Sequence, residues 1–140
     1  MRCVILALVG GALAGCGGVE PMGLMATIQT ADGRRVDFAG EAKATATDVV
    51  SIAASDPVTG WRLTVTVPPR PGDYVLGKDR PTVQATWSGN DALATSGRAT
   101  VLSIGNRGEL IVGTLTDVHL DAGDREVCVV SAATFSARLP

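Results

Sequence analysis

The segment WRLTVTV, residues 61–67, decides the fold class of this chain. Its apolar residues at 61, 63, 65 and 67 alternate with Arg62, Thr64 and Thr66, and this period of two is typical of a β-strand with one buried face. The same alternation recurs in TVQATW at 82–87 and TFSARL at 134–139. The side chains predicted to be buried are Trp61, Leu63, Val65, Val83, Trp87, Val129 and Phe135.

Turn signals separate these strands along the whole chain. They include ADG at 31–33, PGD at 71–73, SGND at 88–91, GNRG at 105–108 and DAGD at 121–124. Short Val- and Thr-rich strands between such turns predict an all-β domain, a single antiparallel β-sandwich or flattened barrel of eight or nine strands. Val127 and Val129 share the parity of Phe135, which predicts one long final strand without a bulge.

The stretch 41–54 leaves an alternative open. EAKATATDVVSIAA is rich in alanine, which suits a helix, but its threonines and valines favour extended backbone. We predict a strand there, with a helix as the alternative.

The first sixteen residues, MRCVILALVGGALAGC, have the pattern of an export signal. Arg2 precedes an apolar run, 3–13, that is shorter than the about 20 residues needed to span a bilayer. The run ends in LAGC, 13–16, which resembles the lipobox of bacterial lipoproteins. That resemblance implies cleavage between Gly15 and Cys16, a diacylglycerol on the Cys16 thiol and acylation of the new amino group. The alternative is an ordinary signal peptide whose apolar run happens to meet a cysteine.

The expected organisation is a signal peptide at 1–15, a lipidated Cys16 with a short tether at 16–23, and a β-sandwich domain at 24–140. The strand order of ATIQTADGRRVDF, PRPGDYVLG, GELIVGTLTDVHL and AATFSARLP resembles small bacterial lipoproteins that join a lipobox to one compact β-sandwich. The resemblance implies a location in the cell envelope, anchored to the membrane through Cys16. Because Gly17 rather than aspartate follows Cys16, it implies the outer membrane where the cell has one.

Charge and cysteine content narrow the classes of partner. The formal net charge is −2, which argues against nucleic acid. Cys3 would be removed with the signal and Cys16 acylated, so Cys128 would have no disulfide partner in the mature chain. Within the apolar run VCVV we expect Cys128 to be a small buried hydrophobe.

Few residues suggest a metal-binding or catalytic role. Asp117, His119 and Asp121 would share one face of a strand and are weak candidates for a divalent metal site, although no known ligand spacing is matched. A catalytic triad would need His119 with a serine brought close by the fold, and the candidates are Ser51, Ser55 and Ser103. We expect no catalytic residues, no cofactor and no enzymatic activity.

Two further features could contact ligands. Trp61, Trp87 and Tyr74 could line a sugar-binding surface, but the two tryptophans are expected in the core. The polar stretches 88–97 and 120–126, with Asp121, Asp124 and Glu126, are the candidate partner-binding loops.

The predicted function is a non-catalytic binding or assembly module of the cell envelope with a protein partner there. The alternatives are a structural envelope lipoprotein without a specific ligand, or a hydrolase or metal-binding protein that uses His119.

Overall fold

A computed structural model of the chain describes residues 23–79 and 81–140. All regular elements in these ranges are strands, so the predicted all-β class is confirmed. The stretch 41–54 is extended rather than helical, as predicted, but it belongs to two strands separated by residues 47–49 instead of one. The signal peptide, its cleavage site and Cys16 lie outside the described residues. The strands are β1 (Gly23–Thr30), β2 (Arg35–Ala46), β3 (Val50–Ser55), β4 (Arg62–Val67), β5 (Gly72–Val75), β6 (Thr82–Trp87), β7 (Asn90–Ile104), β8 (Leu110–Ala122) and β9 (Arg125–Arg138).

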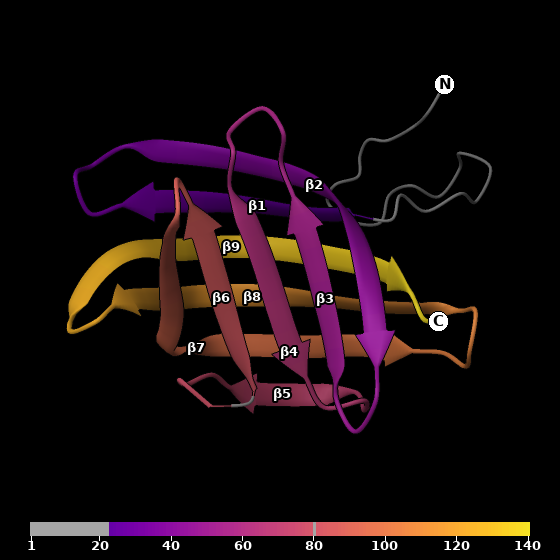
Figure 1. The fold of residues 1–140 in the computed structure, drawn as a ribbon. Coiled ribbons are helices and arrows are strands. Elements are labelled where there is room, and N and C mark those ends of the chain that lie inside the picture. The colour runs from indigo at the N-terminus through magenta and orange to yellow at the C-terminus, as the bar shows by residue number, and fades with distance from the viewer. Residues whose placement is uncertain (1–22, 80) are drawn as a thin grey trace.

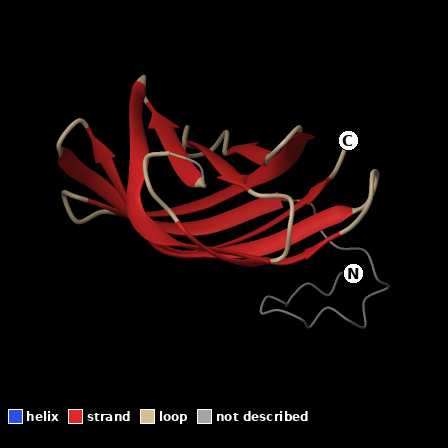
Figure 2. Cartoon of the chain, turned by 90° about the horizontal axis from the view of Figure 1, so that it is seen from below, coloured by secondary structure: helices blue, strands red, loops and turns tan. Residues whose placement is uncertain are grey.

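The strands form one antiparallel sheet that closes on itself. Its order is β5-β7-β6-β4-β3-β2-β1-β9-β8, and a further pairing of β7 with β8 closes eight of the strands into a barrel, with β5 attached outside on β7. The barrel is flattened, since β3, β4 and β6 cross in front of β1, β8 and β9 (Figure 1). Figure 2 shows the long strands curving around the interior between these two layers. The predicted alternative of a flattened barrel is thus the observed architecture.

The long strands β2 and β7 turn the corners between the layers. On β2, residues 35–41 pair with β1 and residues 41–46 pair with β3. Gly40 lies at this change of partner, and a Cβ atom there would lie 2.5 Å from the carbonyl oxygen of Ser55. Glycine therefore lets β3 end tightly against β2. Gly97 on β7 has a φ of 129° and an equally close neighbour in Val118.

The predicted register of β4 is confirmed. Leu63 and Val65 are completely buried, whereas Thr64 and Thr66 lie on the outer face. Trp61, Val83 and Phe135 are also buried as predicted, but Trp87 is only half-buried at the edge of the core. In the central strands, the alternate residues that the sequence predicts to face inward therefore form the core.

The prediction of an unbulged final strand is wrong. Cys128 and Val130 face the core on β9, while Val127 and Val129 are half-buried on the outer face. Ser131 is an extra residue in the pairing with β1, so the inward positions pass from Val130 to Ala133 instead of to residue 132. A β-bulge of this kind reverses the parity of everything beyond it. The Ser131 hydroxyl donates to the Thr27 carbonyl at 3.2 Å, which holds the bulge in place.

Candidate functional site

The two tryptophans lie at one end of the barrel. The rings of Trp61 and Trp87 stack with centroids 4.4 Å apart and planes 9° from parallel. They line an open depression of about 360 Å³ whose other walls come from the β3–β4 and β6–β7 turns. Tyr74 is elsewhere, on β5, where its hydroxyl donates to the Arg70 carbonyl at 2.6 Å. The structure therefore does not bring the three aromatic residues together as a sugar-binding surface.

Asp56 is a buried polar residue that lines the depression beside the two tryptophans. It is 5 % exposed and is the buried polar residue among those that the structure describes. Its carboxylate accepts the Ala39 N–H at 3.1 Å on one oxygen and the N–H groups of Val58 (2.9 Å) and Thr59 (3.4 Å) on the other. One side chain thus joins the β2 corner to the β3–β4 turn. It also satisfies an Ala39 amide that lies beyond the end of β3.

These hydrogen bonds decide the charge state of Asp56. Burial raises the pKa of its carboxyl, but the backbone N–H groups of Ala39, Val58 and Thr59 and the Thr59 hydroxyl outweigh that effect. The pKa of Asp56 therefore lies below its ordinary value, and the group is a carboxylate at neutral pH. These donors already engage the carboxylate, so the role that we assign to Asp56 is structural.

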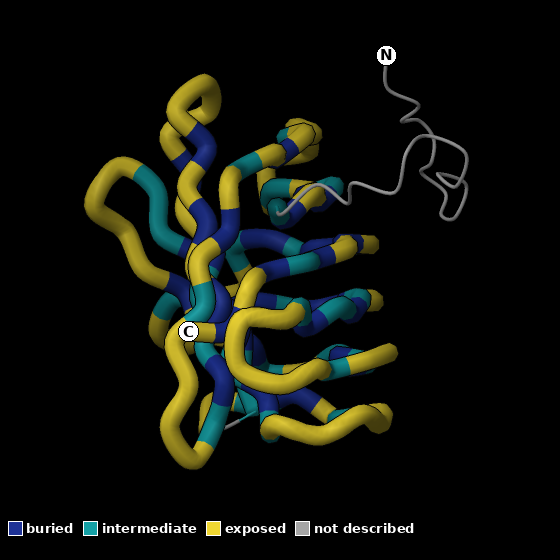
Figure 3. The backbone as a smooth tube through the Cα atoms, turned by 90° about the vertical axis from the view of Figure 1, so that its right-hand side faces the viewer, coloured by how far each residue is buried: buried dark blue, intermediate teal, exposed yellow. Residues whose placement is uncertain are grey.

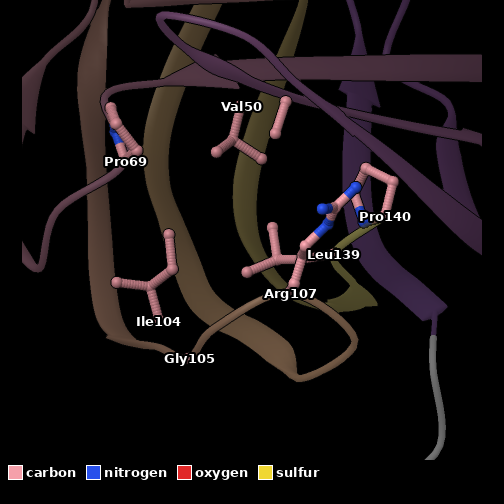
Figure 4. Close-up of a pocket in the computed structure, with 8 residues that line it drawn as sticks. Val50, Pro69, Ile104, Gly105, Arg107, Leu139 and Pro140 are labelled. Atoms are coloured by element: carbon pink, nitrogen blue, oxygen red, sulfur yellow. The ribbon is translucent and has the colours of Figure 1, made fainter.

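A second depression lies at the other end of β3 and β4. It has a volume of about 260 Å³, and Figure 4 shows Val50, Ile104 and Leu139, from three different segments, around it. Pro69 and Pro140 complete an apolar wall, and Arg107 is the one charged residue of the lining.

The predicted metal candidates are not assembled into a site. His119 Nδ1 lies 2.6 Å from Glu126 Oε1, across the β8–β9 hairpin. Asp117 sits at an irregular position with a φ of 48°, exposed to solvent. No cluster of three or more His, Cys, Asp or Glu side chains with metal-binding geometry occurs in 23–79 or 81–140. The pairing of His119 with Glu126 was not anticipated from sequence, because it depends on the register of the hairpin.

The predicted serines lie away from His119 on other contacts. Ser51 shares a hydrogen bond with the Thr66 hydroxyl, and Ser55 accepts from Arg62 Nε at 3.1 Å. Ser103 pairs with Val112, nearer the opposite end of β8 from His119. The fold therefore does not bring any of the three to the histidine.

Cys128, the free cysteine among the residues that the structure describes, is a core residue, as predicted. Burial raises the pKa of Cys128 to about 11, and the Glu126 carboxylate adds to that rise. A thiol with this pKa is almost entirely protonated at neutral pH and is a poor nucleophile.

The two stretches predicted as partner-binding loops, 88–97 and 120–126, are mostly strand, so their loop character is wrong, while their contact with a partner stays a prediction. Residues 90–97 belong to β7, so only Ser88 and Gly89 form the turn after β6. Of the stretch 120–126, Leu120 is buried in β8, and only Gly123 and Asp124 lie between β8 and β9. The residues between the strands, Ser88 with Gly89 and Gly123 with Asp124, make tight hairpin turns, and the polar residues beside them belong to the strands.

We expect Asp56→Asn to lower the free energy of unfolding by about 1–3 kcal/mol at neutral pH, because an amide replaces a charged acceptor of three buried bonds. The folded-state pKa of Asp56 is depressed, so its stabilisation is present above the ordinary aspartate pKa of about 3.9 and is lost as pH falls through the folded value. The gap between wild type and variant in urea unfolding should therefore shrink as pH is lowered from about 3.9, the ordinary aspartate pKa, through the lower folded-state value.

Asp37→Asn is the matched control, since Asp37 lies exposed on β2 and forms an ion pair with the exposed Arg35 side chain. It should change the free energy of unfolding by about 0.5 kcal/mol or less. Equal destabilisation by the two variants would contradict the role given to Asp56.

In comparisons with known proteins, no protein family, curated protein or solved structure matches the chain. The described residues contain no helix capable of crossing a membrane.

Proposed function

We propose that this protein is a lipid-anchored, non-catalytic binding or assembly module of the cell envelope, placed in the outer membrane where the cell has one. The observation that carries the proposal is LAGC at 13–16, whose Cys16 lies seven positions before Gly23, the first residue of β1. Seven residues reach at most about 24 Å, so an acylated Cys16 would hold the barrel against the bilayer.

The open edge of β5 supports a partner-binding role. Within the described residues β5 pairs with β7 alone, so one edge of Gly72–Val75 has no strand beside it. The Leu76 N–H donates to the Gly97 carbonyl on β7, and by strand alternation the backbone groups of Asp73 and Val75 point to the open edge. Val75 is 75 % exposed there. An extended segment of a partner could add to this edge by main-chain hydrogen bonds.

The apolar depression with Arg107 extends this surface. Pro69 lines the depression, and β5 begins three residues later. A segment running along β5 could place an apolar side chain against Ile104 and Leu139, and a carboxylate near Arg107. We therefore propose a protein partner with an extended apolar segment that carries an acidic group.

The His119–Glu126 pair is the observation that keeps a hydrolase or metal-binding function as the second candidate. A carboxylate on Nδ1 is the arrangement that orients a histidine base. The pair nevertheless lies on the outer face of the β8–β9 hairpin, with roughly half of each side chain exposed. A hydrolytic activity of the purified protein that disappears in His119→Ala would overturn the non-catalytic proposal.

The anchor is tested by Cys16→Ala. Wild-type protein should fractionate with membranes and enter the detergent phase, whereas the variant should accumulate as an unprocessed precursor without lipid, because the acylated atom is missing. Mass spectrometry of both proteins measures the modification. Normal processing and fractionation of the variant would contradict the lipobox assignment.

The partner edge is tested by Val75→Pro. Proline removes an outward N–H that β7 does not use, so the barrel should stay intact while an added strand is blocked. With a photo-reactive residue in place of Lys78, wild-type protein should form a discrete crosslink in intact cells and the proline variant should lose it.

Val75→Thr is the control, since it keeps the N–H and the β-branched shape and should keep the crosslink. An unchanged crosslink in a folded Val75→Pro protein would exclude β5 as the binding edge.

A further inference from the structure

The strand register places the start of the domain level with the tryptophan end of the barrel. One row of paired residues crosses the sheet through Gly23, Glu41, Ser55, Arg62, Thr86 and Asp91. Ser55, Arg62 and Thr86 in this row also line the depression beside Trp61 and Trp87. Gly23 and Ser55 are two strand spacings apart, about 10 Å. The point where the chain enters the barrel is therefore close to the β3–β4 turn.

The β3–β4 turn carries an apolar side chain with nothing around it. Val58 is 92 % exposed, the most exposed large hydrophobic residue that the structure describes. Figure 3 shows the turn as an exposed projection at the top of the barrel. The residues after Asp56, which are Pro57, Val58, Thr59 and Gly60, carry no charge. Moving such an uncharged tip into the interfacial region of a bilayer costs little desolvation free energy, and the burial of the Val58 side chain there is favourable.

The surroundings of the tip are those of an interfacial site. Half-buried Trp87 stacks on Trp61 just behind the turn, and tryptophan is enriched where membranes meet water. Arg62 stands in the same row with its Nε bound to the Ser55 hydroxyl, and its exposed charge can meet lipid phosphate. Glu41 and Asp91 add negative charge to the row that contains Arg62. This end of the barrel therefore has no net positive charge in the row that would attract it to an anionic surface.

We infer that the end of the barrel formed by the β3–β4 and β6–β7 turns docks on the phospholipid surface, with Val58 inserted at the interface and Trp87 beside it. This inference rests on the proposed lipid anchor, because an acylated Cys16 within about 24 Å of Gly23 brings this end to the bilayer. The occupant is the bilayer that holds the anchor. The depression with Arg107 then faces away from it, since residues 46 and 50 lie at the opposite end of the β2–β3 pairing from Ser55. Figure 1 also shows β5 at the bottom of the view, away from the β3–β4 turn at the top.

Intrinsic fluorescence can test this orientation, because the chain has two tryptophans and both lie at this end. Full-length lipidated protein would be reconstituted into phosphatidylcholine vesicles, with or without bromine atoms on the headgroup-proximal part of the acyl chains. Bromine quenches tryptophan only at short range. We expect about twofold loss of emission in brominated vesicles for wild type, as for rings held at the interface.

The matched variants are Val58→Asp and Val75→Asp. Both replace an exposed valine, and flotation of the vesicles first checks that each protein remains anchored. Val58→Asp should lose most of the quenching because a carboxylate resists insertion, whereas Val75→Asp, on β5, should keep it. Failure of wild type to float would overturn the proposed anchor, and this inference with it. Protein that floats but is not quenched, or that is quenched equally in Val58→Asp, would overturn the docking alone.

Discussion

A buried carboxylate fixes the end of the barrel on which the rest of the arrangement depends. The sheet can close only because β2 changes partner from β1 to β3, and at that change the amide of Ala39 extends beyond the last residue of β3. Asp56 supplies the missing acceptor and holds Val58 and Thr59 with its second oxygen. Burying a charge is costly unless it is well bonded, and here the backbone donors of two segments meet that cost. The corner, the turn and the exposed tip are thereby joined into one unit.

The closed barrel separates two ends with different chemistry. One carries the stacked tryptophans, Val58 and the entry of the chain at Gly23. The other carries an apolar depression with Arg107, close to the free edge of β5. Under the proposed lipid anchor this difference would acquire a direction, because the tryptophan end is level with Gly23, where β1 begins. The two proposals, a bilayer at one end and an extended protein segment at the other, are consistent with each other.

The sequence predicts most of the fold but little of the site. Alternation in 61–67 and 82–87 predicts the inward residues except Trp87, which is half-buried, because these short central strands have one buried face and no irregularity. On the last strand alternation holds for 134–139 but fails for Val127 and Val129, since the bulge at Ser131 depends on the pairing with Thr27, far away in the chain. Polar stretches such as 88–97 look like loops by composition, but the hairpin needs only Ser88 and Gly89. The roles of Asp56 and Val58 depend on three-dimensional neighbours, and the motif DPVTG signals only a turn.

The link between Asp56 and Ala39 can be measured directly as hydrogen exchange of the Ala39 amide, followed by NMR. If the carboxylate joins the β2 corner to the turn, the Ala39 amide should exchange as slowly as the amides in the middle of β3 and β4. In Asp56→Asn the protection of the Ala39 amide should fall more than the protection of those strand amides. Rapid exchange of Ala39 in the wild-type protein, at the rate of an exposed turn amide, would contradict the account.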